Sequence, residues 1–480
     1  MIVCQSQQSH SAPASGCSPE SLKKVCVCHY GRVTDVGMDM GFWREKVCPC
    51  LSFSPQKTAE SALPQGNCRT RRFIRIMVVI ITMVIINREE AKFINGTKKW
   101  VLLYGRRKTG KTFLVKNFVK ADDYFFVKRD RTIINGAEMG YEAFIAMLRE
   151  RLKSGHTIAI DEFHRLGDDF LDTLHSLGGY GKLILLSSTL HMSKKMLSAR
   201  SPLLGLVAEV QLGLMPLDSV FREISRLGFP KKEALELAVI CMEPMAADYI
   251  KPRRPARDTI VEIMLSTIHT IPALVGEIFT EEDRQISAVY EGILRAVSVG
   301  KNKAGEITNH LFSKKLIQKE SSAMIQQYLK NLTDFGIIKR VLVFNRGEYF
   351  YDMVSPLMKL YFYSDEKYNF GEEASTEKAK RILSELLPHL IESSVREHMA
   401  RKLGLQEAIV SEKDSEVDIC LLRFKKPEVV GEVKWKNLTP KEITGIQEKL
   451  EKIDAARKVL FVPDNKGVRS KLEVLDAEAL

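Results

Sequence analysis

Short apolar runs alternate with amphipathic stretches through the first part of the chain that carries a regular pattern. Four apolar runs predict buried strands. They occupy residues 101–104, 124–127, 157–160 and 182–186. Three stretches of helical periodicity lie among them, at residues 113–120, 141–152 and 170–177. Strands and helices that alternate in this way predict a parallel sheet covered by helices on both faces.

The pattern changes after residue 215. Residues 217–285 are amphipathic and helical but are interrupted by Pro230, Pro244, Pro252 and Pro255, which predicts a small helical lid or a plain helical connector. Three short helical stretches and two strands that flank Asn345-Arg-Gly347 follow, and this order predicts a winged helix. The helices are expected at 290–297, 304–312 and 321–332, and the strands at 337–344 and 348–352.

The first 83 residues show neither the helical nor the strand periodicity of apolar residues. The apolar run 76–86 is 11 residues long, too short for a membrane-spanning helix, which needs about 20. Part of this run is expected to be a first buried strand. We interpret residues 1–83 as a disordered or mis-annotated leader, with translation beginning at Met77 or Met83.

Composition adds two constraints. The formal charge of +12 and a pI near 9.1 favour a polyanionic partner without requiring one. Seven of the nine cysteines fall within the first 68 residues, leaving Cys241 and Cys420 beyond, so the folded domains are predicted to be cytoplasmic. The Cys-x-Cys pairs at 26/28 and 48/50 are spaced too closely for a usual zinc site.

A glycine-rich loop follows the first predicted strand and precedes a predicted helix. Glycines allow backbone N–H groups to point at phosphate oxygens, and the helix adds its positive end. Lys111 is expected to reach the β- and γ-phosphates of ATP, and Thr112 to bind Mg²⁺. The predicted nucleotide-binding loop consists of Gly105, Arg106, Arg107, Lys108, Thr109, Gly110, Lys111 and Thr112.

Two carboxylates end the predicted strand at 157–160. We assign Asp161 to Mg²⁺ and Glu162 to general-base activation of the attacking water, with Lys111 as the second catalytic residue. The alternative interpretation is that Asp161 and Glu162 are two solvated acids at a strand end without a catalytic role. Ser188, at the tip of the strand 182–186, is predicted to sense the γ-phosphate, although a plain turn would also carry serine there.

Four segments in this order resemble the archaeal P-loop ATPase family of the AAA/STAND branch. They are Ile86-Asn-Arg-Glu-Glu90, the loop 105–112, Ile160-Asp-Glu-Phe163 and Ser201-Pro-Leu203. The likeness covers about residues 84–480, because the family's C-terminal restriction-endonuclease-like domain is also expected. It implies a nucleotide domain that opens at Asn-Arg-Glu-Glu.

The chain departs from that family twice. The family continues Ser-Pro-Leu with an aromatic residue, Gly and Arg, whereas Leu204-Gly205-Leu206 has no arginine after the glycine, although Arg200 lies close by. Cys241-Met-Glu-Pro244 stands where the family carries Gly-Gly-x-Pro. We therefore predict nucleotide binding with slow hydrolysis.

The predicted winged helix offers polar and basic residues to DNA. Its third helix would enter a major groove, with wing residues near phosphate, but such domains also serve as protein-contact modules. The candidate residues are Gln326, Gln327, Lys330, Lys339, Arg340 and Arg346.

Acidic and lysine residues on two C-terminal strands have the spacing of a metal-dependent nuclease. Period two places Glu432 and Lys434 on one face, where Asp418 of the neighbouring strand can join them. Two carboxylates would hold Mg²⁺ and the lysine would position water, with Glu397 as a further ligand. An exposed strand with ordinary ion pairs is the alternative interpretation.

Together these features predict an α/β protein with five segments. They are a leader (1–83), a P-loop ATPase domain (84–215), a helical lid (216–285), a winged helix (286–365) and a restriction-endonuclease-like domain (378–480). The predicted function is an ATP- and Mg²⁺-dependent ATPase switch acting on DNA, with possible self-association and no membrane partner. The alternatives are a STAND-like signalling scaffold that binds proteins and an ATP-gated nuclease.

Overall fold

The computed structural model describes residues 85–86, 88–190, 205–281, 286–410 and 417–480. The chain divides into two units, Met1–Thr82 and Met83–Leu480, and every described residue belongs to the second. The predicted leader, its cysteine pairs and most of the apolar run 76–86 lie outside the described residues. So do Ser201-Pro-Leu203 and Arg200.

The first sheet belongs to the predicted ATPase domain and has seven strands in the order β4-β3-β2-β5-β6-β1-β7. Strands β2, β5, β6, β1 and β7 pair in parallel, and β3 and β4 add an antiparallel edge. The parallel sheet expected from the sequence is thus confirmed. The strands are β1 (Trp100–Tyr104), β2 (Asp123–Val127), β3 (Ile133–Asn135), β4 (Ala137–Met139), β5 (Thr157–Asp161), β6 (Lys182–Ser187) and β7 (Val207–Gln211).

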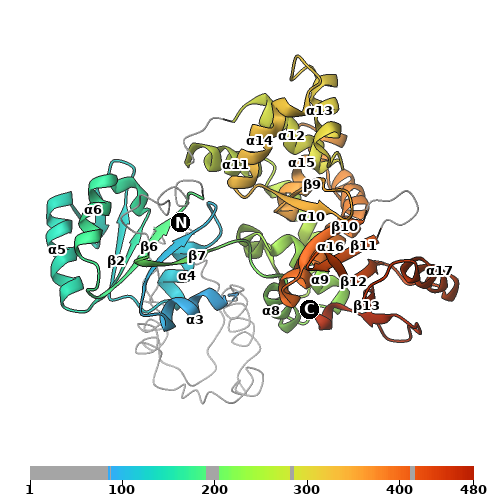
Figure 1. Ribbon diagram of the computed structural model, residues 1–480, viewed down its shortest axis with the longest axis horizontal. Coiled ribbons are helices and arrows are strands. Elements are labelled where there is room, and N and C mark those ends of the chain that lie inside the picture. The colour runs from blue at the N-terminus through green and yellow to red at the C-terminus, as the bar shows by residue number, and fades with distance from the viewer. Residues whose placement is uncertain (1–84, 87, 191–204, 282–285, 411–416) are drawn as a thin grey trace, which may run out of the picture. The chain divides into compact units, whose positions relative to one another are not determined.

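Helices cover both faces of this sheet, as the alternating pattern predicts (Figure 1). On one face, α5 (Tyr141–Lys153) and α6 (Asp168–Ser176) bury Phe144 and Phe170 against the strands. On the other, α3 (Glu89–Gly96) and α4 (Lys111–Phe118) bury Ile94 and Leu114. A short 3₁₀ helix, η1 (Phe163–Leu166), follows β5. Each helix therefore presents an apolar stripe to the sheet.

Eight helices follow the first sheet within the described residues up to 368. They are α8 (Leu217–Arg226), α9 (Lys231–Cys241), α10 (Ala256–Ser266), α11 (Thr270–Glu281), α12 (Ala288–Ser298), α13 (Ala304–Ser313), α14 (Ser322–Asp334) and α15 (Pro356–Tyr368), with the 3₁₀ helix η2 (Pro244–Tyr249) after α9. The long helix α16 (Thr376–Leu403) succeeds them. Among the described helices, none is individually long and apolar enough to cross a membrane, although α10 and α11, bent by 59°, pass that test as a pair.

A second seven-stranded sheet has the order β14-β13-β12-β11-β10-β8-β9. Its strands are β8 (Ile338–Val343), β9 (Tyr349–Met353), β10 (Gln406–Val410), β11 (Val417–Arg423), β12 (Lys426–Val433), β13 (Arg457–Phe461) and β14 (Glu473–Leu475). Helix α17 (Pro440–Glu451) connects β12 to β13, and the 3₁₀ helix η3 (Ala477–Ala479) ends the chain.

The hairpin expected to be the wing of a winged helix is part of this second sheet. Strand β8 pairs antiparallel with β9 and parallel with β10, where Ala408 lies opposite Leu342. One hydrophobic core also runs from α9 through α12 and α16 to β13, with Val239, Leu294, Ile391 and Phe461 all buried in it. The lid, the three-helix segment and the C-terminal strands therefore share a core, which the sequence pattern did not predict.

Candidate nucleotide site

Backbone geometry forms the loop between β1 and α4. A side chain at Gly105 would place its Cβ 2.2 Å from the carbonyl oxygen of Leu212, so glycine is required there. Gly110 has a φ of 89°, in the left-handed region that favours glycine, and helix α4 begins at the next residue. Both glycines of the predicted loop thus have a steric reason.

Lys111 turns its side chain back onto this loop. Its Nζ donates to the carbonyl oxygens of Gly105 (2.9 Å) and Arg106 (3.0 Å). The residue is buried, and this burial lowers the pKa of Lys111 to about 8, although the charges of Glu162 and Asp161 oppose the shift. The ammonium is therefore held in the concavity where a phosphate would be bound.

Asp161, at the end of β5, joins the loop to the sheet. Its Oδ2 accepts hydrogen bonds from the Thr112 hydroxyl (2.6 Å) and the Tyr124 hydroxyl (2.5 Å). Burial and the neighbouring Asp161 raise the pKa of Tyr124, so the phenol remains a donor. The other oxygen, Oδ1, is buried and has no hydrogen-bond partner in the described part of the chain. A buried carboxylate oxygen without a donor, next to a threonine hydroxyl, fits Mg²⁺.

Glu162 lies one residue further and has a left-handed backbone, with φ 57° and ψ 35°. Its Oε2 accepts a hydrogen bond from the Ser188 hydroxyl at 2.7 Å. His164 Nδ1 lies 3.6 Å and an Arg165 guanidinium nitrogen 3.7 Å from the same oxygen. The predicted base and the predicted sensor are thus in contact, at a residue whose backbone conformation is uncommon for a side chain other than glycine.

Lys111, Thr112, Glu162 and Ser188 line one cavity of about 900 Å³, whereas Asp161 is not among its lining residues. Apolar side chains also belong to the lining. The apolar lining includes Ile86, Phe118, Met215, Pro244 and Met245. A lining that combines polar and apolar side chains suits a ligand with phosphate and a ring system.

Two arginines that sequence analysis left without a role shape the cavity. Arg88 donates to the carbonyl oxygens of Thr109 (3.0 Å) and Gly213 (3.1 Å), which ties the loop to the segment after β7. Arg165 donates from NH1 to the carbonyl oxygen of Val127 at 2.9 Å. The resemblance at Ile86-Asn-Arg-Glu-Glu90 pointed to Arg88, whereas nothing in the pattern pointed to Arg165.

A buried ion pair connects the loop with the helical segment. The guanidinium of Arg106 contacts both carboxylate oxygens of Glu243, at 2.8 and 3.0 Å, and the Glu243 side chain is fully buried. The Ser355 hydroxyl, at the N-cap of α15, donates to the same carboxylate at 2.7 Å. Arg107 forms a more exposed pair with Glu277 of α11 at 2.7 Å. The first two residues after Gly105 are thus both paired with acids outside the ATPase domain.

The C-terminal sheet brings together three of the four residues predicted as a nuclease site. Lys434 Nζ lies 3.0 Å from Asp418 Oδ2 and is also paired with Glu432. Lys449 of α17, which was not predicted, contacts the other Glu432 oxygen at 2.5 Å. Asp418, Glu432, Lys434 and Lys449 are called the C-terminal cluster below. Glu397 instead pairs with Lys339 at 2.6 Å.

Burial governs the charges of this cluster. Burial opposes ionisation of Asp418, but Lys434 and the N–H of Val433 outweigh it and lower the pKa of Asp418. Burial and the charge of Asp418 raise the pKa of Glu432. In the described residues no group of three or more His, Cys, Asp or Glu side chains suits a metal ion.

The residues predicted to contact DNA separate into two groups. Gln326, Gln327 and Lys330 on α14 are exposed, as are Arg340 and Arg346. Lys339 is an exception to the prediction, because its ammonium bonds to Glu397 and Glu407 between β8, α16 and β10. The pairing of β8 with β10 directs this side chain into the protein, so Lys339 is not a phosphate contact.

A glycine-rich loop between strand and helix, with its lysine and threonine in one cavity and a strand-end aspartate bonded to that threonine, defines a P-loop nucleotide-binding domain. Residues 97–220 match the model of a family described as AAA domain. This part of the chain is therefore an ATP-binding P-loop ATPase domain of the AAA type.

Solved structures give looser matches. The ORC2 protein of Aeropyrum pernix is 12% identical, with 64% of this chain and 94% of that chain covered and a TM-score of 0.35. The ORC1 protein of the same organism, in complex with DNA, is 15% identical over 64% and 96%, with a TM-score of 0.29. A STAND protein with a tetratricopeptide repeat sensor from Pyrococcus horikoshii is 17% identical over 67% and 52%, with a TM-score of 0.28. Similarities at this level support no inference, and a comparison with curated proteins finds no match.

Proposed function

We propose that the chain is a Mg²⁺-dependent ATP hydrolase that acts as a nucleotide-dependent switch on DNA. Lys111, Thr112 and Glu162 line one cavity, and Asp161 accepts a hydrogen bond from Thr112 while its other oxygen is buried without a hydrogen-bond partner among the described residues; this arrangement carries the proposal. These groups have complementary tasks in phosphoryl transfer, which needs positioning and charge stabilisation more than covalent chemistry.

Each side chain has a role that follows from its position. Lys111 leaves the carbonyls of the loop and binds the β- and γ-phosphates, while backbone N–H groups of the loop surround them. Thr112 and Asp161 would hold Mg²⁺, which would supply positive charge to the phosphates. Glu162 accepts a proton from the attacking water. Ser188, now bonded to Glu162, is placed to exchange that contact for the γ-phosphate.

Arg165 is assigned to the charge that develops on the γ-phosphate. It lines the cavity beside Glu162, its guanidinium is held by the Val127 carbonyl, and its side chain is 13% exposed. An arginine in this position is worth several powers of ten in rate in related chemistry. It would act within one chain, which suits a sequence without an arginine after Gly205.

The switch is carried by the chain of contacts Arg106, Glu243 and Ser355. Lys111 uses the Arg106 carbonyl as an acceptor, so its transfer to phosphate removes a bond from this residue. Arg106 is joined through Glu243 to the N-terminus of α15. A change at the loop is therefore passed to the helical segment by groups that are too buried to exchange partners with water.

The test compares Mg-ATP binding and turnover in the full chain. Lys111→Ala is expected to weaken binding by at least about 100-fold, because a buried charge contact to phosphate is lost. Lys120→Ala, an exposed lysine beyond the end of the same helix, is the control. Arg165→Ala is expected to retain binding and lose turnover. Binding by Lys111→Ala at wild-type affinity contradicts the site, and binding without turnover in the wild type favours the STAND-like scaffold.

The DNA role is supported by the exposed residues of α14 and by the charge of +12. We interpret α12–α14 with β8–β9 as a winged helix whose α14 faces a major groove. Duplex binding is expected to weaken as salt rises, and Lys330→Ala to reduce the salt dependence. Duplex affinity that does not change between low and moderate salt would count against phosphate contact.

A metal-dependent nuclease is the second candidate, and the meeting of Asp418, Glu432 and Lys434 favours it. The restriction-endonuclease-like interpretation of the C-terminal strands stands on this cluster. Nicking with Mg²⁺ or Mn²⁺ is expected to vanish in Asp418→Ala and in Lys434→Ala. Nicking that persists in both variants would place any cleavage activity elsewhere.

A further inference from the structure

The β11–β12 hairpin ends in a two-residue turn away from the sites considered so far. Arg423 lies opposite Lys426, so Phe424 and Lys425 form the turn. Their φ angles of 48° and 69° are those of a turn that strongly prefers Asn-Gly. A phenylalanine in this conformation is rare, because its bulky side chain disfavours positive φ. Folding of the hairpin therefore does not account for the choice of residues.

Phe424 is far more exposed than any other large apolar residue that the structure describes. Its exposure is 95%, whereas the other exposed large hydrophobic residues lie between 42% and 51%. Single apolar residues on a surface are common, but an exposure of 95% means that the Phe424 side chain contacts almost no neighbouring atoms. Phe424 presents both faces of its ring to solvent.

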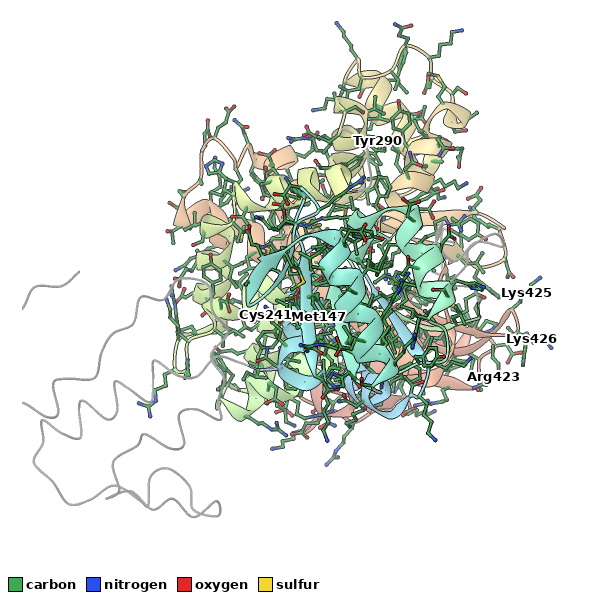
Figure 2. The ribbon with its side chains drawn as sticks, turned by 90° about the vertical axis from the view of Figure 1, so that its left-hand side faces the viewer. Met147, Cys241, Tyr290, Arg423, Lys425 and Lys426 are labelled. Atoms are coloured by element: carbon green, nitrogen blue, oxygen red, sulfur yellow. The ribbon has the colours of Figure 1, made fainter. Side chains whose placement is uncertain are left out.

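Positive charges surround this ring. Arg423, Lys425 and Lys426 are all exposed, and their side chains project outward in Figure 2. The nearby acid Glu428 pairs with Arg423 at 3.4 Å. Neither lysine forms an ion pair with a carboxylate in the part of the chain that the structure describes. Three cations and one carboxylate thus leave this turn with a net positive charge.

The hairpin holds the turn in place. Strand β11 pairs with β10 and β12 pairs with β13, so both strands lie inside the sheet. Pairing with β13 begins at Val429, and residues 423–428 extend beyond it. The turn is therefore a projecting tip on a supported base, which holds the ring and the lysines near one another before any partner binds.

We propose that this hairpin tip, residues 423–426, binds single-stranded nucleic acid. The Phe424 ring stacks on an unpaired base, and Lys425 and Lys426 contact phosphates on either side. Stacking needs an open aromatic face and tolerates any base, and flanking cations follow the backbone. The inference rests on the proposed DNA role. It extends that role to unpaired strands and to a binding surface other than α14.

Single-stranded nucleic acid fits the tip better than the other polyanionic surfaces. An anionic membrane would be held through buried apolar area, and one ring supplies little. A paired duplex hides its base faces, so a ring could reach them only by separating base steps. An unpaired strand offers base faces and phosphates together, which matches a ring flanked by cations.

The test uses the double variant F424N/K425G in the full chain. It replaces the tip with the residues that the turn prefers, so the hairpin should fold at least as well. Binding of a fluorescein-labelled oligothymidine of about 20 nucleotides is measured by anisotropy over a range of salt concentrations. We expect affinity to fall about 10-fold and the salt dependence to decrease. Phe424→Trp should retain affinity, with its fluorescence quenched on binding.

The matched control is K92A/F93A, an adjacent exposed lysine and phenylalanine on α3, which should bind as the wild type does. Unchanged affinity in F424N/K425G overturns the tip proposal and leaves the DNA role standing. A wild type that binds neither duplex nor single strand overturns both. Loss of binding to phosphatidylserine vesicles, with oligothymidine affinity intact, assigns the tip to a membrane and also overturns the proposal.

Discussion

Two carboxylate sites in this chain differ in how completely the protein itself satisfies them. At the nucleotide site, one buried oxygen of Asp161 has no hydrogen-bond donor among the described residues. Glu162 Oε2 lies 3.6 Å from His164 Nδ1 and 3.7 Å from a guanidinium nitrogen of Arg165. In the C-terminal cluster, both oxygens of Glu432 contact a lysine and Asp418 accepts from Lys434 and Val433. The first site therefore gains bonds when a cation arrives, whereas the second must exchange them.

This difference bears on catalysis at the two sites. A buried oxygen without a partner raises the energy of the free protein, and a ligand removes that penalty. Carboxylates already neutralised by lysines offer less to a metal ion. The nucleotide site is therefore better suited to chemistry than the C-terminal cluster, and four measurements test this difference.

The largest effect is expected at Glu162. Glu162→Gln keeps the Ser188 contact but cannot accept a proton, so ATP turnover should fall about 10²- to 10³-fold with Mg-ATP affinity nearly unchanged. Turnover and equilibrium binding are measured on the same preparation. Glu150→Gln, an exposed acid on α5, is the control. Turnover close to that of the wild type would remove Glu162 from the reaction and weaken the contrast.

The next effect is on stability, at the ion pair that joins the loop to the helical segment. Glu243→Ala leaves Arg106 buried without its partner and should lower the free energy of unfolding by about 3–5 kcal/mol. The measurement is denaturant unfolding. Glu277→Ala removes the partner of the adjacent Arg107 in a more exposed pair and should change stability by about 1 kcal/mol or less. Equal losses would mean that burial does not distinguish the two pairs.

A smaller effect is expected from pH. The pKa of Lys111 is lowered to about 8, and its unfolded value is higher, so the unfolded chain binds more protons above pH 8. This group therefore makes stability rise with pH from about 8 to 10. ATP binding has the opposite dependence, because phosphate requires the ammonium.

Between pH 7 and 9, ATP affinity should thus fall about 10-fold if the protonated form binds. The dissociation constant of a fluorescent ATP analogue is measured across this range. Lys111→Arg remains charged throughout and should show a nearly flat profile. A wild-type profile as flat as that of Lys111→Arg would show that Lys111 stays protonated in the folded chain.

The sequence predicts those parts of the fold and of the site whose residues are close together along the chain. The strand, loop and helix from residue 100 to 118 are contiguous, and the run before Asp161 is apolar over four residues, so the parallel sheet and the phosphate loop could be predicted. Eight of the eleven predicted nucleotide-site residues line the cavity, namely Arg107, Lys108, Thr109, Gly110, Lys111, Thr112, Glu162 and Ser188, whereas Gly105, Arg106 and Asp161 are not among its lining residues.

Contacts between distant segments could not be predicted. Arg106 and Glu243 are 137 residues apart, and Glu243 and Ser355 are 112 apart, without any shared periodicity. The pairing of β8 with β10 could not be predicted either, because neither strand carries a sequence signal that specifies its parallel neighbour. That pairing turned Lys339 inward and gave Glu397 its partner. Period two correctly placed Glu432 and Lys434 together, but it could not reveal Lys449 on the next helix.

The smallest effect is expected in the C-terminal cluster. Lys434→Met removes the ammonium between Asp418 and Glu432, and Lys449 still neutralises Glu432, so stability at pH 7 should fall by about 1–2 kcal/mol. The lowered pKa of Asp418 means that its contribution is present above about pH 4 and is lost as pH falls through the folded value. The difference between wild type and variant should therefore narrow below pH 4.

Urea unfolding at pH 7 and pH 3 measures this difference. The control is Lys436→Met, because Lys436 lies two residues after Lys434 and forms an exposed ion pair with Glu442. A variant more stable than the wild type at pH 7 would show that Lys434 is kept at a cost in stability. Groups retained in that way are typical of functional sites, because selection for activity tolerates the loss. The C-terminal cluster would then resemble the nucleotide site, because both would contain polar groups that destabilise the folded protein in the absence of a ligand. Such a result would favour the nuclease candidate.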